Sequence, residues 1–446
     1  MHEAWRGDGV SDLRTLATSL RGMSAPPWLR DATDPATLTE ALRERIGRVV
    51  PGAADLTGVR VRDVRARRSW SLRLDADVVT GDEQRAVTLL AQLPLPGSAV
   101  VAPHPGAVDV PSLGMTVRLA EREDGLPTVR TLSSPGPARA LLQSALAGGR
   151  ASPRLDRVRS RLVRDKPGRR ATLVCDLVWD RGADPSVPRR IVAKVYRDDS
   201  GSSTHAWMSA LWDGPLRHSE RPRLAEPLGY LADERTLLQR GLPGETTLAD
   251  LLADRTPDAP PVPAALREAG AGLAALHGCG VTTGPRRTAG SELTTADELL
   301  ARLAPTFPDR EAEVRELLGT LGRFLGEDPR GPVPVHGAFR PAQVLLDGLR
   351  PGFLDFDGFG QGEPALDVGR FLARLQELGR DRPDRLALAG EFLDGYRTAG
   401  PLALDRVGRW LVLDLALAAV RSWYRGGFER AAVLLDLATE ALDSSW

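Results

Sequence analysis

The dominant hydrophobic pattern of this chain changes from strand-like alternation in the first half to helical spacing in the second. Between residues 58 and 117, and again from about 154 to 240, short runs alternate apolar and polar side chains, as half-buried strands do. From about residue 263 onward, apolar side chains recur every three or four residues, as in amphipathic helices. A β-rich block followed by a helical block predicts an α+β fold, and the two parts should meet near residues 241–244.

Size and composition exclude several classes of protein. The 446 residues, 42% of them hydrophobic, suffice for two or three folded units with cores. Lysine plus arginine (59) balances aspartate plus glutamate (59), so no net charge draws the chain to nucleic acid or to an anionic membrane. Cys175 and Cys279 are too few for a disulfide framework. With no signal-peptide core and no apolar run of about 18 residues, we expect a reduced, cytoplasmic protein without a membrane span.

Lysine is rare in this sequence. Lys166 and Lys194 are the only two, asparagine is absent, and nearly all basic residues are arginine, a skew typical of GC-rich coding sequences. A lysine retained in this background marks either a site that needs a compact ammonium group or a surface remnant. The position of each lysine has to decide between these readings.

Pattern shifts divide the chain into three expected regions. Asp34-Pro35 predicts a helix N-terminus that continues to about residue 50, and residues 133–149 predict a second helix closed by glycine. We therefore expect an accessory region over 1–150, a β-rich lobe over 151–240 and a helical lobe over 241–446. The β-rich stretches 59–93 and 158–196 resemble each other weakly, which indicates either a degenerate internal repeat or two unrelated meanders.

Oxygen-bearing side chains gather between residues 333 and 372. Two short predicted strands present Gln343, Asp355 and Asp357 at loops and strand ends. Magnesium binds through one or two carboxylates together with phosphate oxygens, so this stretch is a candidate metal and nucleotide site. The alternative is a hairpin in which the aspartates only hold turns.

Neighbouring segments favour the first alternative, because together they resemble the aminoglycoside phosphotransferase and choline kinase-like family, which is related to the protein kinases. The resemblance covers residues 155–446 and not the first 150 residues. Its segments follow the family's order. They are the strand with the phosphate-binding lysine (191–196), the hinge (237–244), the helix ending in histidine (274–277), the His-Gly catalytic loop (336–345), the metal-binding strand end (354–357) and the Asp-Pro-x-x-Asp-like motif (363–369).

This resemblance implies a two-lobed protein-kinase-like fold that binds ATP and Mg²⁺. Lys194 would hold the α and β phosphates, and Lys166, in a hairpin with two arginines, would add side-chain contacts to phosphate where relatives use glycine-rich backbone. Asp355 and Gln343 would hold magnesium. The remaining nucleotide-binding residues belong to the hinge, against which adenine would lie: Gln239, Gly241 and Leu242.

The chain departs from the family pattern at its centre. Ala338 occupies the position of the catalytic aspartate, and alanine can neither accept a proton nor orient a hydroxyl group. The candidate catalytic residues are then Asp357, on the same face of an extended strand as Asp355, His336, which would orient the loop, and Arg340, which would neutralise charge near the γ-phosphate. Gln343 replaces the family's asparagine, as in the similar bacterial maltokinases.

A second departure concerns the partner of Lys194. Residues 197–219 contain no glutamate to pair with this lysine, although kinase-like folds normally place one on the following helix. Asp213 or Glu220 would reach Lys194 only if that helix had an unusual position.

Two functions remain open at this stage. One is an ATP-dependent phosphotransferase acting on a hydroxyl group of a small molecule or a peptide, with Asp355 and Lys194 at its centre. The other is a pseudokinase that docks a protein partner, possibly through its N-terminal region. Neither reading involves nucleic acid or a membrane.

Overall fold

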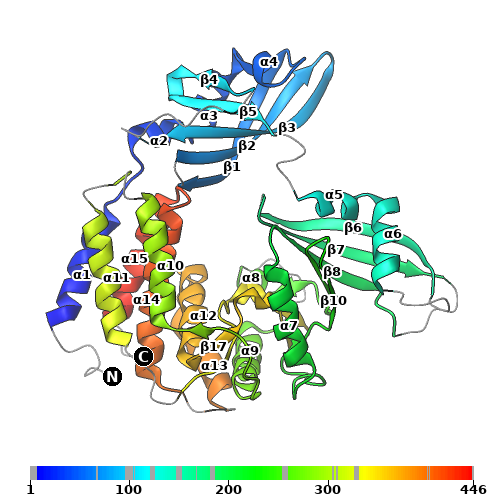
Figure 1. The fold of residues 1–446 in the computed structure, drawn as a ribbon. Coiled ribbons are helices and arrows are strands. Elements are labelled where there is room, and N and C mark those ends of the chain that lie inside the picture. Colours follow the sequence, from blue (N-terminus) through cyan, green and yellow to red (C-terminus); the bar gives the residue numbers. More distant parts are fainter. Residues whose placement is uncertain are drawn as a thin grey trace. The chain divides into compact units, whose positions relative to one another are not determined.

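The computed structural model describes residues 8–443, apart from thirteen short gaps. These gaps are 67–68, 96–103, 105, 121–125, 147–152, 167, 181–185, 254–259, 304–305, 308–309, 326–330, 399 and 401. The fold is α+β, as predicted, with antiparallel sheets in the first half of the chain and mainly helices in the second (Figure 1). No helix in the described ranges is both long and apolar enough to cross a membrane.

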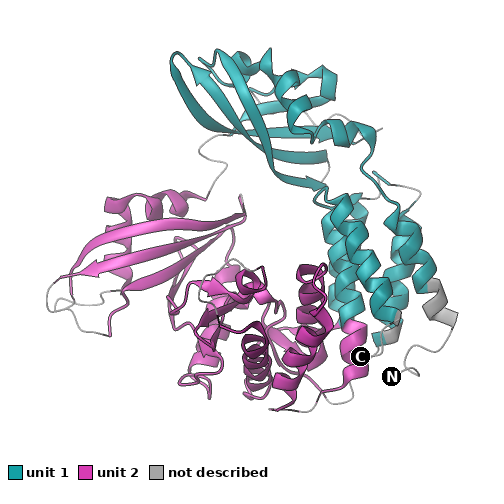
Figure 2. Ribbon diagram, turned by 180° about the vertical axis from the view of Figure 1, so that it is seen from behind, with its two compact units in different colours: residues 1–121, 289–326, 411–446 teal, residues 122–288, 327–410 magenta. Residues whose placement is uncertain are grey.

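The chain forms two compact units, and each is built from separate segments (Figure 2). Unit 1 comprises residues 1–121, 289–326 and 411–446, and unit 2 comprises residues 122–288 and 327–410. These boundaries differ from the predicted divisions at residues 150 and 240. The two units group segments that pack together in space, whereas the three predicted regions are divided where the hydrophobic pattern of the sequence changes.

Unit 1 contains a five-stranded antiparallel sheet with α3 packed on β1. The Asp34 side chain accepts a hydrogen bond from the Thr37 amide, which caps α3 as the sequence predicts. The single helix expected over residues 35–50 is wrong, because the chain breaks at Glu44 and Arg45 into two helices. The elements of this part are α2 (Pro27–Asp31), α3 (Pro35–Arg43), α4 (Ile46–Val49), β1 (Asp55–Ala66), β2 (Ser69–Thr80), β3 (Glu83–Pro94), β4 (Val108–Val110), η1 (Pro111–Leu113) and β5 (Met115–Leu119).

The rest of unit 1 is helical and draws on both ends of the chain. Helix α1 packs against α11 and α15, where the Ser19 hydroxyl donates a 2.7 Å hydrogen bond to Glu313 and Arg21 pairs with Asp436 at 3.0 Å. No pattern in the first 21 residues was strong enough to predict α1. These helices are α1 (Asp8–Arg21), α10 (Ala289–Leu303), α11 (Glu311–Leu325) and α15 (Phe428–Asp443), and α14 (Leu404–Trp423) contributes its second half.

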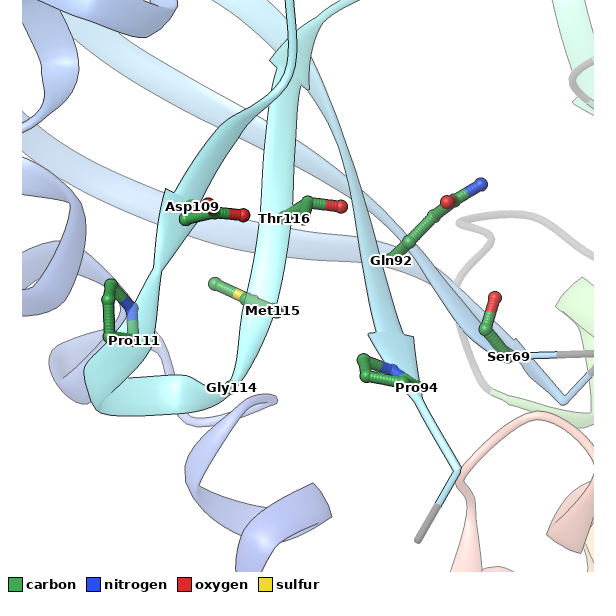
Figure 3. A pocket seen from close by; sticks show the side chains of 8 residues that line it. All are labelled: Ser69, Gln92, Pro94, Asp109, Pro111, Gly114, Met115 and Thr116. Carbon is green, nitrogen blue, oxygen red and sulfur yellow. The ribbon is translucent and has the colours of Figure 1, made fainter. Parts of the chain in front are cut away.

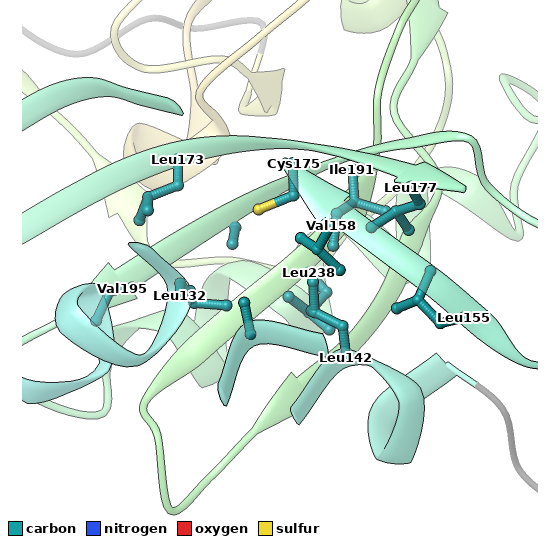
Figure 4. Close-up of a cluster of buried hydrophobic side chains, with 12 residues drawn as sticks. Leu132, Leu142, Leu155, Val158, Leu173, Cys175, Leu177, Ile191, Val195 and Leu238 are labelled. Atoms are coloured by element: carbon teal, nitrogen blue, oxygen red, sulfur yellow. The ribbon is translucent and has the colours of Figure 1, made fainter. Parts of the chain in front are cut away.

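Unit 2 begins with two helices that cover one face of a second five-stranded sheet (Figure 4). Leu132 and Leu142 from the helices pack against Leu173, Ile191 and Val195 from the strands, and all five are at most 1% exposed. The predicted helix over 133–149 and the strand beginning near residue 154 are both present. The elements are α5 (Pro127–Ser133), α6 (Pro135–Leu146), β6 (Leu155–Lys166), β7 (Arg170–Trp179), β8 (Arg190–Tyr196), β10 (Pro227–Leu231) and β11 (Thr236–Arg240).

The two five-stranded sheets share one strand order. Taken in chain order, the strands of each sheet lie as first, second, third, fifth and fourth. In unit 2 the helix α7 lies between the third and fourth strands, whereas residues 96–103 and 105, at the corresponding place in unit 1, lie outside the described residues. The shared order is what an internal repeat would produce, and the repeat itself stays a prediction.

The remaining elements of unit 2 form the helical lobe and its small sheets. They are α7 (Ser200–Trp212), β9 (Arg223–Leu224), β12 (Thr246–Thr247), α8 (Leu248–Leu252), α9 (Val262–His277), β13 (Arg286–Arg287), β14 (Val333–Val335), η3 (Pro341–Gln343), β15 (Val344–Asp347), β16 (Arg350–Phe353), η4 (Phe356–Gly358), β17 (Gly360–Gly362), α12 (Pro364–Leu378) and α13 (Arg385–Arg397). The first half of α14 also belongs to unit 2.

Candidate active site

Strand β8 turns its two faces to different surroundings. Ile191, Ala193 and Val195 point into the core beneath α5 and α6. Because side chains alternate along a strand, Lys194 and Tyr196 lie on the opposite face. Lys194 is nevertheless buried, so its ammonium group requires polar partners on that face.

The neighbouring strand adds a guanidinium group to the same face. In the antiparallel register, Arg170 of β7 lies opposite Tyr196 and Thr172 lies opposite Lys194. Ala171 and Leu173, between and beyond these positions, are buried on the core side. The site face of the sheet therefore carries both an ammonium and a guanidinium group.

Two carboxylates approach this face from the turn that follows β16. The expectation that Asp355 and Asp357 share a face of an extended strand is wrong, because β16 ends at Phe353. Asp355 has a left-handed backbone conformation (φ 67°, ψ 60°), and Asp357 lies in the short helix η4. The backbone reversal at Asp355 allows both side chains to reach one lysine.

Lys194 is clamped between these carboxylates. Its Nζ lies 2.5 Å from Oδ1 of Asp355 and 2.6 Å from Oδ1 of Asp357. The Tyr196 hydroxyl also donates to Oδ1 of Asp357, at 2.9 Å. Arg170 forms an ion pair with Oδ2 of Asp357 and lies 3.6 Å from Asp355. Two strands and one turn thus share a compact network of two acids and two cations.

Burial and charge act in opposite directions within this network. Burial lowers the pKa of Lys194 to about 8, and the carboxylate of Asp355 opposes that effect. For Asp355, burial raises the pKa, but Lys194 and Arg170 outweigh burial and hold it well below its usual range. The ion pair is therefore charged at neutral pH.

Lys166 stands at the end of β6, near the same network. Burial, together with the positive charges of Arg170 and Arg164, lowers its pKa to about 7, while Asp355 opposes the change. Arg340 also lowers the pKa of Lys166, so the predicted catalytic loop lies within electrostatic reach of the hairpin. Of the predicted residues, Lys194, Asp355 and Asp357 are in direct contact, and Lys166 lies within electrostatic range of Asp355 and Arg340.

The predicted catalytic loop is braced by Asp367 at the start of α12. Its carboxylate accepts hydrogen bonds from the amides of His336 (2.6 Å) and Gly337 (2.9 Å). His277, at the end of α9, contacts the same carboxylate at 3.2 Å. Arg370 donates to the Gly337 carbonyl oxygen. Arg370 was not predicted as a site residue, although it lies about one helical turn after Asp367.

Two residues of this loop, His336 and Ala338, differ in solvent exposure and in the groups that they offer. The His336 ring is fully buried, and its Nε2 donates to the Leu354 carbonyl oxygen at 2.9 Å. Burial lowers the pKa of His336, which keeps the ring neutral. The bond links the loop to the turn that bears Asp355, so the geometry matches an orienting role. Ala338 is partly exposed and supplies no polar side-chain group.

Gln343 has the oxygen that a metal site requires. Its side chain is buried, and Oε1 has no hydrogen-bond partner among the described residues. The Gln343 carbonyl oxygen accepts from the Leu354 amide at 2.9 Å, which ties this residue to the segment preceding Asp355. A carboxylate and an unpaired carboxamide oxygen are the ligand types that magnesium prefers, so the donor set fits this ion.

The hinge residues are placed outside the lysine network. The Gln239 amide lies 2.8 Å from the sulfur of Met208 on α7, and the Gly241 amide donates to the Arg190 carbonyl oxygen at 2.9 Å. Leu242 follows β11 and is partly exposed. None of the hydrogen bonds or ion pairs of the described residues joins these three to Lys194.

The acidic residues considered for Lys194 lie elsewhere. Helix α7 carries no acidic side chain, and Asp213 is exposed at its C-terminal end. Glu220 pairs with Arg350 at 3.4 Å. The turn after β16 supplies the carboxylate partners of Lys194 instead.

Tyr196 was not predicted from the sequence as a member of the site, and Arg170 was predicted only as one of the cations of the hairpin, not as a partner of the carboxylates. A signal for Tyr196 was present, because it lies two residues after Lys194 and so shares its face of the strand. This role of Arg170 could be found only from the β7–β8 register, which depends on the hairpin between them.

Unit 1 has a hollow of its own, of about 300 Å³, on its sheet (Figure 3). It shares no residue with the lysine network. Its lining comes mainly from β3, β4 and β5: Ser69, Gln92, Pro94, Asp109, Pro111, Gly114, Met115 and Thr116.

Comparison with known proteins gives one family. Residues 176–404 match the sequence profile of the phosphotransferase enzyme family. This range includes β8, the loop at His336 and the turn at Asp355. No curated protein matches the chain.

Solved structures of low sequence identity are similar to part of the chain. A choline/ethanolamine kinase family protein from Mesorhizobium loti is 18% identical, with a TM-score of 0.46, and the match covers 69% of this chain and 98% of that one. A choline kinase from Cryptosporidium parvum is 11% identical (TM-score 0.49), covering 68% and 94%. An aminoglycoside phosphotransferase from Streptomyces rimosus is 20% identical (TM-score 0.41), covering 62% and 96%.

Proposed function

Because the chain belongs to the phosphotransferase enzyme family, we propose that it transfers the γ-phosphate of ATP to a hydroxyl group of a small molecule or a peptide. The observation that carries this proposal is the contact between Lys194 and Asp355. These residues are 161 positions apart in sequence, and their side chains meet at 2.5 Å. Phosphoryl transfer requires such a pairing of a cation for phosphate with a carboxylate for magnesium.

The cations of the sheet would hold the phosphates. Lys194 and Arg170 lie on one face, and Lys166 ends the adjoining strand. Side-chain cations here replace the backbone amides of a glycine-rich loop. The segment after β11 would border the adenine through its backbone, because the Gln239 side chain is turned to Met208.

Asp355 and Gln343 would hold the magnesium ion. When bound, magnesium would neutralise negative charge on the phosphates. The unpaired Oε1 of Gln343 supports this assignment, since a buried oxygen without a partner costs free energy unless a ligand satisfies it. Asp355 would then exchange part of its contact with Lys194 for the metal.

Catalysis would depend on charge neutralisation more than on a general base. Ala338 cannot accept a proton, and a missing base costs roughly 10²- to 10⁴-fold in rate. In a loose transition state, however, positioning and electrostatic stabilisation carry most of the rate acceleration. Lys194, Arg170 and Arg340 would supply that stabilisation.

Ala338 also supports a second candidate function, that of a pseudokinase. In that case the same site would bind nucleotide without turnover, or would bind no nucleotide. The chain would then act by docking a protein partner. Turnover separates the two functions, whereas nucleotide binding does not.

The test measures phosphate transfer by the full chain. The protein is incubated with magnesium and γ-labelled ATP, alone and with a panel of alcohol acceptors that includes choline, aminoglycosides and serine peptides. We expect labelled product, loss of that product in Asp355→Ala, and its retention in the control Asp347→Ala, which changes a half-exposed turn carboxylate paired with Arg223. Background turnover in the wild type and in Asp355→Ala alike would reject the enzyme. Activity that appears only in Ala338→Asp would favour the pseudokinase.

A further inference from the structure

The buried ammonium group of Lys194 contacts two carboxylates, and a magnesium-dependent site needs one of these carboxylates for the metal. Asp355 and Asp357 both contact its Nζ, at 2.5 and 2.6 Å. Of these two, Asp355 is the carboxylate we assign to magnesium. When Asp355 turns to a metal ion, Lys194 still requires a partner, because an unpaired charge at this depth is costly.

Helix α7 cannot provide that partner. In kinase-like folds, a glutamate on the helix after the lysine strand fixes the lysine. Here α7 reads SGSSTHAWMSALW over Ser200–Trp212 and contains no acidic residue. Asp199, directly before the helix, accepts a 2.6 Å hydrogen bond from Tyr230 instead.

Asp357 is built into the sheet in a way that suits this role. Its Oδ1 accepts from Lys194 and, at 2.9 Å, from the Tyr196 hydroxyl. Its Oδ2 is paired with Arg170. Arg170 and Tyr196 lie opposite each other in the β7–β8 register, so the carboxylate is held by groups from two paired strands.

The same contacts argue against a general base at this position. Oδ1 of Asp357 accepts from Lys194 and Tyr196, and Oδ2 lies in an ion pair with Arg170, so two of its three partners are cations. A carboxylate held in this way has little capacity to take a proton from an acceptor hydroxyl. We therefore do not assign to Asp357 the catalytic role that is expected from the sequence.

We propose that Asp357 is the positioning residue for Lys194, and that it performs from the η4 turn the task that α7 cannot perform. Tyr196 and Arg170 orient its carboxylate. The proposal rests on the proposed nucleotide-binding function, because Lys194 is the group that would meet the phosphates. It accounts for how a chain without an acid on α7 keeps its lysine in place.

The first readout uses the fact that the chain has only two lysines. An amine-acylating reagent is applied to the nucleotide-free protein, and the acylation rate at each lysine is read by peptide mass spectrometry. Asp357→Asn should speed acylation of Lys194 about tenfold or more, because the ammonium loses one of its two anchors, and should leave Lys166 within about twofold. Asp347→Asn, the matched control, should change neither rate.

The second readout is a double-mutant cycle on ADP affinity, measured by calorimetry with magnesium. Asp357→Asn should weaken ADP binding about tenfold in the wild-type background and have no further effect in Lys194→Met, since it acts through that lysine. A general base would give the opposite pattern: unchanged ADP affinity, unchanged Lys194 acylation and a turnover loss of roughly 10²-fold or more in both backgrounds. That pattern would overturn the proposal.

A milder variant guards against simple unfolding. Tyr196→Phe removes one hydrogen bond to Asp357 and should shift Lys194 acylation and ADP affinity in the same direction by about two- to threefold. Asp357→Glu should restore part of the ADP affinity lost in Asp357→Asn. If Tyr196→Phe and Asp357→Glu both leave Lys194 unaffected while Asp357→Asn melts early, Asp357 is structural only and the proposal fails. If neither the wild type nor any variant binds ADP but Lys194 acylation responds as expected, the nucleotide function fails and the positioning role stands.

Discussion

At the residue scale, the His336-Gly337 loop depends on one glycine. Gly337 has φ +71°, and a Cβ there would overlap the Gly358 carbonyl oxygen in the η4 turn. The backbone amides of His336 and Gly337 both donate hydrogen bonds to the Asp367 carboxylate. The loop can neither relax nor move away, so it packs tightly against the turn that carries Asp355 and Asp357.

Gly337→Ala should therefore destabilise the protein more than a left-handed backbone alone requires. The control is Gly348→Ala, because Gly348 also has a positive φ (+59°) but has open space around its Cα. We expect a loss of about 1–2 kcal/mol for the control from backbone strain, and clearly more for Gly337→Ala. Thermal unfolding of both variants is the measurement. Equal shifts in melting temperature would contradict the predicted steric overlap.

The lowered pKa of Lys166 predicts a pH dependence of nucleotide binding. With a pKa of about 7, Lys166 loses its positive charge as the pH rises through neutrality, and its contribution to phosphate binding falls with it. Lys166→Arg keeps the charge throughout this range. We expect the ADP affinity of the wild type, divided by that of Lys166→Arg, to fall between pH 6.5 and 8.5. The ratio cancels any titration of Lys194, and a ratio independent of pH would show that Lys166 is already neutral or does not contact phosphate.

The same pKa has a consequence for stability. The folded pKa of Lys166 (about 7) lies below the ordinary lysine value of about 10.5, so the unfolded chain binds more protons between these two pH values. The contribution of Lys166 to folding is thus least favourable below pH 7 and improves as the pH rises toward 10.5. Lys166→Met should remove that contribution, which denaturant unfolding at several pH values can measure.

At the scale of elements, α5 and α6 form the support behind the site. They pack on the face of the sheet opposite Lys194, and Leu142 is completely buried between α6 and the strands. A sheet with one unsupported apolar face could not hold β7 and β8 in the register that pairs Arg170 with Tyr196. The site thus depends on helices that precede its first strand.

Leu142→Ala should cost about 2–5 kcal/mol of stability through the cavity it leaves. Leu141, the adjacent residue, is only partly buried, and Leu141→Ala should cost much less. Denaturant unfolding gives the energies, and hydrogen exchange of β6, β7 and β8 should show the loosening in Leu142→Ala only. Similar losses in both variants would mean that α6 is not seated on the sheet as described.

Much of the element pattern was predictable, and the geometry of the site was not. Alternation in residues 191–196 indicated the strand and its buried face, because periodicity is a local property. The left-handed conformation of Asp355 depends on contacts with residues that are distant in sequence. These are the packing of Gly337 against Gly358 and the ion pair of the Asp355 carboxylate with Lys194. Sequence alone therefore placed Asp355 and Asp357 on a strand that ends before them.

At the scale of the whole molecule, unit 1 is completed by chain segments from both ends and from an insertion. Trp70, fully buried on β2, donates to the hydroxyl of Thr306 at 3.1 Å, and the amide of Ala66 donates to the Tyr424 carbonyl oxygen at 2.9 Å. The pairing of such distant segments leaves no periodic signal in the sequence. For this reason pattern alone placed residues 289–326 and 411–446 with the helical lobe.

Removing residues 1–121 should thus do more than delete an accessory region. It would uncover the faces of α11 and α15 that pack on α1, as well as the partners of Trp70 and Ala66. We expect the truncated chain to aggregate or to bind a hydrophobic dye, as measured by light scattering and dye fluorescence. A monomeric truncated chain with unchanged melting would show that the helices of unit 1 are stable without the N-terminal segment.

The segment order also has a consequence for synthesis on the ribosome. Unit 2 ends at residue 410, so its core can close while the last 36 residues of the chain are still emerging or unmade. Unit 1 needs residues 411–446 and must wait until that segment has been synthesised, with its opening sheet already outside the exit tunnel. Unit 2, which carries the proposed nucleotide site, can thus be completed before unit 1, although the sheet of unit 1 is synthesised first.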